Sequence, residues 1–279
     1  MSKLAEMLEL DNVRLLEPDY ASLVNNGEPG VLICEAEPVE NGSRLLIDEE
    51  DSPLLFAVKS GDEWCGTSWL FRPPTSGELA LFEAADGDIY QEDREDVEDA
   101  CRAYYAEILE KTIPPAGDDL TADRIAKVRD LLHEMWGSSI SGIALDACAG
   151  SGIGSLLLSE MGARPIAYDN DPELLALGLS SGRLSPERMV CIDARIASAY
   201  LPDAAYGVGI MFGQIYGYTK DIWRPIVEEL AGITENTLIT VATEEEAHWV
   251  KEWAKGVDRT LEIMENTRDP IYDRWVCFG

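Results

Sequence analysis

The sequence predicts an α/β fold in which a seven-stranded, mostly parallel sheet with an antiparallel last strand follows a smaller α+β region. Apolar strand and helix patterns alternate from about residue 139 onward, and short alternating elements indicate a parallel sheet covered on both faces. The run 143–158 joins an apolar strand to an apolar helix through a glycine loop. Residues 265–271 lie between the last two expected strands, and a connection this short has no room for a crossover helix, so these strands must pair antiparallel.

Residues 1–118 form the predicted N-terminal region, which is β-rich and ends in a helix. Short apolar runs between Gly, Pro and Asn residues indicate strands at Val31–Cys34, Leu45–Ile47, Leu54–Val58 and Leu79–Phe82. Helical spacing begins near Asp93, and Pro114 ends it. We expect a substrate-recognition or capping domain. The aromatic segment 64–72 is either a substrate-facing surface or part of an ordinary β-domain core.

Residues 119–279 carry the predicted parallel sheet. A helix from the N-cap Thr121 to Gly137 buries an apolar stripe that includes Val128 and Leu132. The expected strands are Ile143–Leu145, Pro165–Tyr168, Met189–Ile192, Gly207–Phe212, Thr237–Val241, Leu261–Met264 and Arg274–Cys277. The expected helices are Ile153–Met161, Pro172–Ser180, Asp221–Leu230 and Glu244–Lys255, the last with a capping box of Thr243 and Glu246.

The composition restricts the partners. The chain has 279 residues and a formal net charge of −31, with 53 acidic against 22 basic residues, of which seven are Lys. Acid-rich, Lys-poor surfaces suit a salty cytosol, although an ordinary acidic protein remains the alternative. Nothing resembles a Lys/Arg patch, so a nucleic acid bound through a broad basic face is disfavoured.

Cysteine usage and hydropathy indicate a cytoplasmic protein. The six cysteines are scattered without a C-x-x-C pair and there are two histidines, so no metal site is expected. The acidic N-terminus has no apolar core of a signal peptide, and no run of about 18 apolar residues predicts a membrane span. The oligomeric state is left open.

The glycine loop distinguishes between ligands. A dinucleotide fingerprint G-x-G-x-x-G would need Gly150, Gly152 and a third glycine, but Ser155 stands at the third position. Asp146, four residues before Gly150, would add negative charge beside a pyrophosphate. A carboxylate there suits a cationic ligand instead.

With Asp146-Ala147-Cys148-Ala149-Gly150-Ser151-Gly152, the chain resembles the class I S-adenosylmethionine-dependent methyltransferases, whose first motif is D-x-G-x-G-x-G. Cys148 replaces the first glycine. The resemblance covers roughly residues 121–279 and implies a Rossmann-like fold. It also implies that Asp146 and the loop backbone hold the methionine end of S-adenosyl-L-methionine.

Two further acids follow successive strands. Asp169 ends the second predicted strand, where a carboxylate can accept hydrogen bonds from both ribose hydroxyls. Asp171 before Pro172 is a helix N-cap. By resemblance, Asp193 after the third strand accepts from the adenine amino group. The predicted cofactor-binding set is Asp146, Ala147, Cys148, Ala149, Gly150, Gly152, Asp169, Asn170, Asp193, Ala194 and Phe212.

The segment after the fourth strand lies beside the reactive methyl group in this superfamily. Phe212-Gly213-Gln214-Ile215 lacks the D/N-P-P-Y/F motif of enzymes that methylate base amines, which disfavours adenine or cytosine N-methylation. Gln214, Tyr216 and Tyr218 are candidates for orienting an acceptor, or are loop anchors.

Three functions stay open at this stage. The first is methyl transfer to a small molecule or a protein side chain. The second is RNA or DNA methylation, and the third is a non-catalytic module that binds S-adenosylmethionine or serves in assembly.

Overall fold

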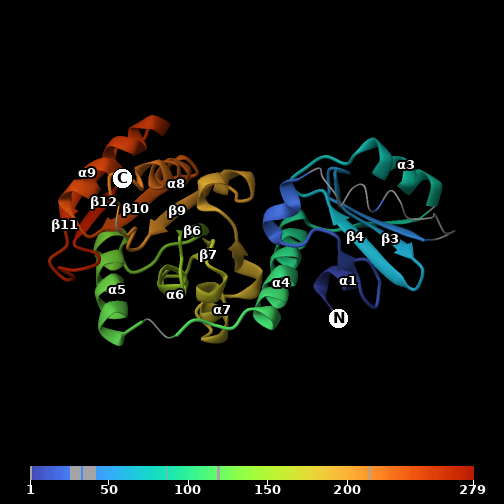
Figure 1. Cartoon of the computed structure of the whole chain (residues 1–279), viewed down its shortest axis with the longest axis horizontal. Helices are drawn as coiled ribbons and strands as arrows, with labels where there is room; N and C mark the ends of the chain where they lie inside the picture. The colour runs from blue at the N-terminus through green and yellow to red at the C-terminus, as the bar shows by residue number, and fades with distance from the viewer. Residues whose placement is uncertain (1, 26–32, 34–41, 86, 118–119, 214) are drawn as a thin grey trace. The chain divides into compact units, whose positions relative to one another are not determined.

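A computed structural model describes residues 2–25, 33, 42–85, 87–117, 120–213 and 215–279. The chain forms two compact units, Met1–Ile108 and Leu109–Gly279, whose elements are labelled in Figure 1. The boundary between the units therefore falls inside a long helix, ten residues before the predicted domain limit at residue 118.

The first unit contains a five-stranded sheet in the order β1-β4-β3-β2-β5. Its strands are β1 Arg14–Leu15, β2 Ser43–Ile47, β3 Pro53–Ser60, β4 Glu63–Ser68 and β5 Asp88–Gln91. Its helices are α1 Lys3–Met7, η1 Tyr20–Val24, α3 Ser76–Ala85 and α4 Arg94–Thr112, which runs past the unit boundary. Trp69 is buried and stacks on Phe56 at 5.5 Å between ring centroids. The aromatic segment therefore contributes to the core of this unit.

The predicted strand Leu79–Phe82 is wrong, because these residues lie in helix α3. Thr75 and Glu78 form a reciprocal cap: the Glu78 N–H donates to Thr75 Oγ1 at 3.3 Å, and the Thr75 N–H donates to Glu78 Oε2 at 2.6 Å. Leu81 is buried whereas Leu79 is 43% exposed, so these residues form a helix that buries only one of its faces. Of the predicted strand Val31–Cys34, all but Ile33 lies outside the described residues.

The second unit confirms the predicted seven-stranded sheet, in the order β11-β12-β10-β9-β6-β7-β8. The strands are β6 Ile143–Ala147, β7 Arg164–Asp169, β8 Met189–Cys191, β9 Ala204–Gly209, β10 Thr234–Val241, β11 Glu262–Glu265 and β12 Trp275–Phe278. The last strand, β12, pairs antiparallel with both β10 and β11, and every other pair in this sheet is parallel. The carboxyl ends of the parallel strands therefore share one edge.

Helices cover both faces of this sheet (Figure 1). They are α5 Ala122–Trp136, α6 Ile153–Glu160, α7 Pro172–Ser180, α8 Lys220–Gly232 and α9 Glu244–Ala254, with short 3-10 turns η2 Pro186–Arg188, η3 Ala194–Ala199 and η4 Lys255–Val257. Val276 packs into a cluster with α5 and α6, while the neighbouring Cys277 Sγ contacts the Ala247 carbonyl of α9 at 3.4 Å. Adjacent strand residues point to opposite faces, so each face has its own helical cover.

The caps predicted at Thr121, Asp171 and Thr243 are confirmed, each side chain accepting from backbone N–H groups of the following turn. One strand limit is corrected: β9 ends at Gly209, not at Phe212. The reason is Met211, whose left-handed φ of 58° breaks the extended backbone while its N–H donates to Thr240 Oγ1. No helix in the described part of the chain is both long and apolar enough to span a membrane.

Candidate functional site

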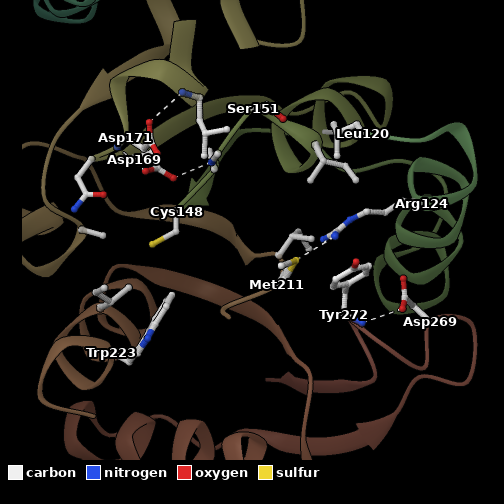
Figure 2. Close-up of a pocket in the computed structure, with 18 of the residues that line it drawn as sticks. Leu120, Arg124, Cys148, Ser151, Asp169, Asp171, Met211, Trp223, Asp269 and Tyr272 are labelled. Atoms are coloured by element: carbon white, nitrogen blue, oxygen red, sulfur yellow. Dashed lines mark hydrogen bonds between the residues drawn. The ribbon is translucent and has the colours of Figure 1, made fainter. Parts of the chain in front are cut away.

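A cavity of about 1130 Å³ lies at the carboxyl edge of the larger sheet. Its walls come from the loops after β6, β7, β8 and β9, the first turns of α5 and α8, and the loop between β11 and β12. Figure 2 shows Cys148 and Asp169 on one side, Arg124 and Tyr272 on the other, and Met211 between them. Segments far apart in the sequence therefore meet in one hollow.

The loop after β6 has the glycine-loop geometry that the motif predicts. Cys148, Gly150 and Gly152 all have left-handed backbones, with φ of 49°, 53° and 90°. Cys148 therefore takes, with a side chain, a conformation that favours glycine, at a cost of about 1–2 kcal/mol. Its thiol faces the cavity, and burial raises the pKa of this thiol, so it stays protonated near neutral pH.

Asp146 lies beneath this loop rather than in the cavity wall. Its carboxylate is 1% exposed, and Oδ2 accepts from the Ser155 N–H at 2.6 Å and from Ser155 Oγ at 2.8 Å. It occupies the N-terminal end of α6, where the helix dipole favours a negative charge. Burial raises the pKa of Asp146 to about 7. Ala147 and Gly152 are also absent from the lining, so direct contact of these three residues with a cofactor stays a prediction.

Asp169 does line the cavity, at the end of β7. It is 8% exposed; Oδ2 accepts from the Gly150 N–H and Oδ1 from the Asp171 N–H, each at 2.8 Å. Burial raises the pKa of Asp169, and these two hydrogen bonds oppose the increase. Each carboxylate oxygen has a second lone pair. The side chain is therefore fixed by the loop and still has capacity to accept from a ligand.

Asp193 follows β8 and also lines the cavity. It pairs with Arg195, whose Nε donates to Asp193 Oδ2 at 2.9 Å, and this hydrogen bond is the main cause of the lowered pKa of Asp193. Both side chains are partly exposed. Of the predicted cofactor residues, the cavity brings together Cys148, Ala149, Gly150, Asp169, Asn170, Asp193 and Ala194.

The wall beside β9 is apolar. Phe212, predicted to bind the cofactor, is fully buried outside the lining and packs against Trp223 at 5.2 Å between ring centroids. A Cβ added at Gly209 would lie 2.3 Å from the Phe212 ring, so glycine makes room for it. Phe212 thus supports Trp223, which itself faces the cavity together with Met211.

The predicted acceptor-side residues lie elsewhere. Gln214 is outside the described residues. Tyr216 and Tyr218 stack on each other at 5.3 Å with planes 17° apart, both exposed, and neither is in the cavity lining. Tyr216 is tied into its turn by its N–H, which donates to Thr219 Oγ1 at 2.8 Å. A catalytic role for either candidate stays a prediction.

Sequence reasoning missed the opposite wall, which Arg124, Met211 and Tyr272 form with the segment 269–271. A topological signal for Arg124 was available. A helix that runs antiparallel to the strand after it begins at the carboxyl edge of that strand. Arg124 in the first turn of α5 is thereby placed at the same edge as the loop after β6.

No protein-family model matches this chain, and no curated protein matches it. The chain is similar to the solved structure of precorrin-6y C5,15-methyltransferase from Geobacter metallireducens, with 14% identity, a TM-score of 0.42, and coverage of 60% of this chain and 93% of that one.

Two further solved structures are similar. Magnesium protoporphyrin IX methyltransferase from Synechocystis, with bound S-adenosylmethionine, is 11% identical with a TM-score of 0.44, covering 58% of this chain and 85% of that one. An rRNA methylase from Streptococcus thermophilus is 14% identical with a TM-score of 0.43, covering 58% and 97%.

Proposed function

We propose that this protein transfers a methyl group from S-adenosyl-L-methionine to a small, largely apolar acceptor. The observation that carries the proposal is the pair of carboxylates, Asp169 and Asp193, which follow the adjacent strands β7 and β8 and line one cavity with the loop after β6. This is the edge at which open α/β sheets bind nucleoside-like ligands.

The electrostatics of the loop fit a phosphate-free ligand. In a dinucleotide site, the N–H groups of the loop and of the helix start would face a pyrophosphate. Here the Gly150 N–H donates to Asp169 and the Ser155 N–H donates to Asp146, so carboxylates already take both groups. A pyrophosphate would meet negative charge at this position, whereas a sulfonium and an α-ammonium are attracted by it.

The residues of the chain have defined tasks in this proposal. Asp169 would accept hydrogen bonds from the ribose hydroxyls, and Asp193 from the adenine amino group. The loop backbone at Cys148 and Gly150 would lie against the ligand. When bound, S-adenosyl-L-methionine supplies an electrophilic methyl carbon on its sulfonium, and the leaving group is the neutral thioether of S-adenosylhomocysteine. The wall of Met211 and Trp223 keeps water away and places an acceptor, and in such a displacement positioning accounts for much of the rate.

The cavity also suggests the kind of acceptor. Its volume exceeds the roughly 300–1,000 Å³ typical of one drug-sized ligand, which leaves room for a second small molecule. Of the ten exposed large hydrophobic side chains among the described residues, seven lie on the segments after β8 and β9 and before β12: Ile196, Met211, Tyr216, Tyr218, Ile222, Ile271 and Tyr272. This surface favours apolar contact, and the net charge of −31 disfavours a polyanion.

Binding is tested by titration calorimetry with S-adenosylhomocysteine on wild type and Asp169→Asn. The variant loses charge-assisted hydrogen bonds to the ribose, so we expect affinity to fall about tenfold or more. Asp258→Asn is the matched control, since Asp258 is exposed, is not among the lining residues and has a left-handed backbone that Asn tolerates. Equal affinity of the folded Asp169→Asn protein and wild type would reject the site.

Activity is tested by incubating the protein with extract and methyl-labelled cofactor. We expect label in the small-molecule fraction that organic solvent extracts. Label confined to RNA would favour the nucleic-acid alternative, and no labelled product would favour the non-catalytic module.

A further inference from the structure

Arg124 stands out in the wall opposite the carboxylates. Among the described residues that line the cavity, the cations are Arg124, Lys127 and Arg195. Arg195 pairs with Asp193, and Lys127 is bonded to Asp123 at 2.7 Å on the surface. Arg124 is the most enclosed of the three, with a side chain 16% exposed. The cavity thus combines several carboxylates with one enclosed guanidinium.

Three side chains from two segments hold this guanidinium in place. Its Nη2 lies 3.3 Å from Asp273 Oδ2, and its Cζ lies 5.2 Å from the centre of the Tyr272 ring. Its Nη1 donates to Met211 Sδ at 3.1 Å. Asp273 is itself buried and accepts from Thr240 Oγ1 at 2.6 Å, which fixes the anchor. Arg124 therefore has a defined orientation at the cavity wall before any ligand arrives (Figure 2).

The partner of Nη1 is a weak one. A thioether sulfur is a poor hydrogen-bond acceptor, and a guanidinium edge is shaped for the two oxygens of a carboxylate. A ligand carboxylate at this edge would replace a contact of low strength with charge-assisted bonds. Elsewhere in the lining, Asp169, Asp193 and Asp269 would repel such a group.

We propose that Arg124 is the carboxylate-binding subsite of the cavity, with Asp273 and Tyr272 as its positioning residues. The inference rests on the proposed function. The carboxylate comes either from the amino-acid part of the cofactor or from the acceptor. Both sources present the same chemistry to the guanidinium, and two arms of one experiment separate them.

The first arm compares S-adenosylhomocysteine with 5′-methylthioadenosine, which lacks the amino acid, by calorimetry on wild type and Arg124→Gln. If the cofactor supplies the carboxylate, the variant binds S-adenosylhomocysteine about 10- to 100-fold more weakly and methylthioadenosine equally well. Arg124→Lys keeps the charge without the planar edge and should recover part of the loss. Arg129→Gln is the control, because Arg129 lies on the same helix and pairs with the surface residue Glu160.

The second arm titrates benzoate into protein loaded with S-adenosylhomocysteine. If the acceptor supplies the carboxylate, wild type binds benzoate and Arg124→Gln does not, while both nucleosides bind normally. Because Arg124→Gln leaves Asp273 buried without its cation, the double variant with Asp273→Asn is measured beside it.

The outcomes separate the two proposals. Unchanged binding of S-adenosylhomocysteine and of benzoate in the folded double variant would overturn the subsite and leave the proposed function standing. Failure of wild type to bind either nucleoside would overturn both.

Discussion

The buried carboxyl of Asp146 should make the second unit less stable as the pH rises. In the unfolded chain this group titrates near 3.8, and in the folded protein near 7, because burial disfavours its charged form. Below pH 4 the carboxyl is protonated in both states. Between pH 4 and 7 only the folded state keeps the proton, so stability falls with increasing pH. Above pH 7 both states are ionised and the full penalty applies.

The size of the effect follows from the shift. About three pKa units at about 1.4 kcal/mol each correspond to about 4 kcal/mol of lost stability between pH 4 and pH 8. Asp146→Asn carries no charge at any pH, so this decline disappears. The amide oxygen can still accept from Ser155, while the new NH₂ group adds a constant cost of about 1–3 kcal/mol if it finds no acceptor.

The assay is urea unfolding of full-length wild type and Asp146→Asn from pH 4 to pH 8, read by pulsed hydrogen exchange on peptides of β6. This readout follows the unit that contains Asp146. The difference in unfolding free energy, wild type minus variant, should fall by about 4 kcal/mol across the range, because the other groups titrate in both proteins. Asp258→Asn, at an exposed position, should give a curve parallel to wild type. A constant difference between wild type and Asp146→Asn would refute the reasoning.

Three further substitutions test packing and polar networks by urea unfolding. Gly154→Ala places a Cβ 2.3 Å from Asp146 Oδ1 and should cost about 1–3 kcal/mol, whereas Gly117→Ala, with open space around its Cβ, should cost little. Glu78→Gln removes the buried partner that Arg72 holds at 2.7 Å and should destabilise the first unit by about 3 kcal/mol; a loss below 1 kcal/mol would contradict a fully desolvated pair. Thr243→Ala deletes the cap of α9 and should cost about 1 kcal/mol, with lower helix content as the accompanying signal.

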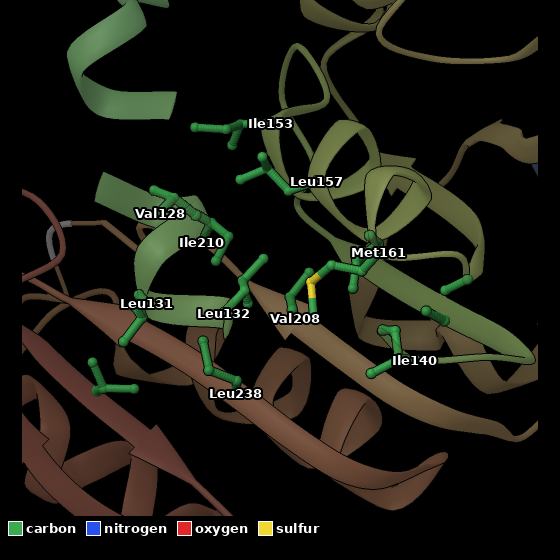
Figure 3. Packing of buried hydrophobic residues seen from close by; sticks show 14 residues of the cluster. Val128, Leu131, Leu132, Ile140, Ile153, Leu157, Met161, Val208, Ile210 and Leu238 are labelled. Carbon is green, nitrogen blue, oxygen red and sulfur yellow. The ribbon is translucent and has the colours of Figure 1, made fainter. Parts of the chain in front are cut away.

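Hydrophobic periodicity predicted the second unit well because each of its helices buries one apolar face against the sheet. Val128 and Leu132, placed on the inner face of the helix by their spacing, pack in one cluster with Val208 of β9 and Leu238 of β10 (Figure 3). The same kind of pattern misled at Leu79–Phe82, where four apolar residues are too short a run to distinguish a strand from a helix. The Thr75–Glu78 cap was the available signal that decides between them.

The site was predictable where a residue follows directly from its strand. Asp169 and Asp193 lie at strand ends, and parallel topology alone brings them to one edge. Arg124 and Tyr272 were not found, because their proximity depends on how α5 and the loop between β11 and β12 meet across the sheet edge. Tyr216 was a candidate for orienting the acceptor because it follows the fourth strand of the predicted sheet. Its ring stacks on Tyr218 and is not among the residues that line the cavity.

Two residues that line the cavity have strained backbone conformations. Cys148 after β6 and Met211 after β9 are non-glycine residues with left-handed backbones, and their strands are neighbours in the sheet. Each conformation costs about 1–2 kcal/mol and persists where the surrounding structure holds it in place. Glycine would relieve the strain at either position and remove part of the wall, because both side chains face the cavity. Under the proposed methyl transfer, these two side chains would shield the reacting methyl group from water, which gives a reason for the fold to keep both strained conformations.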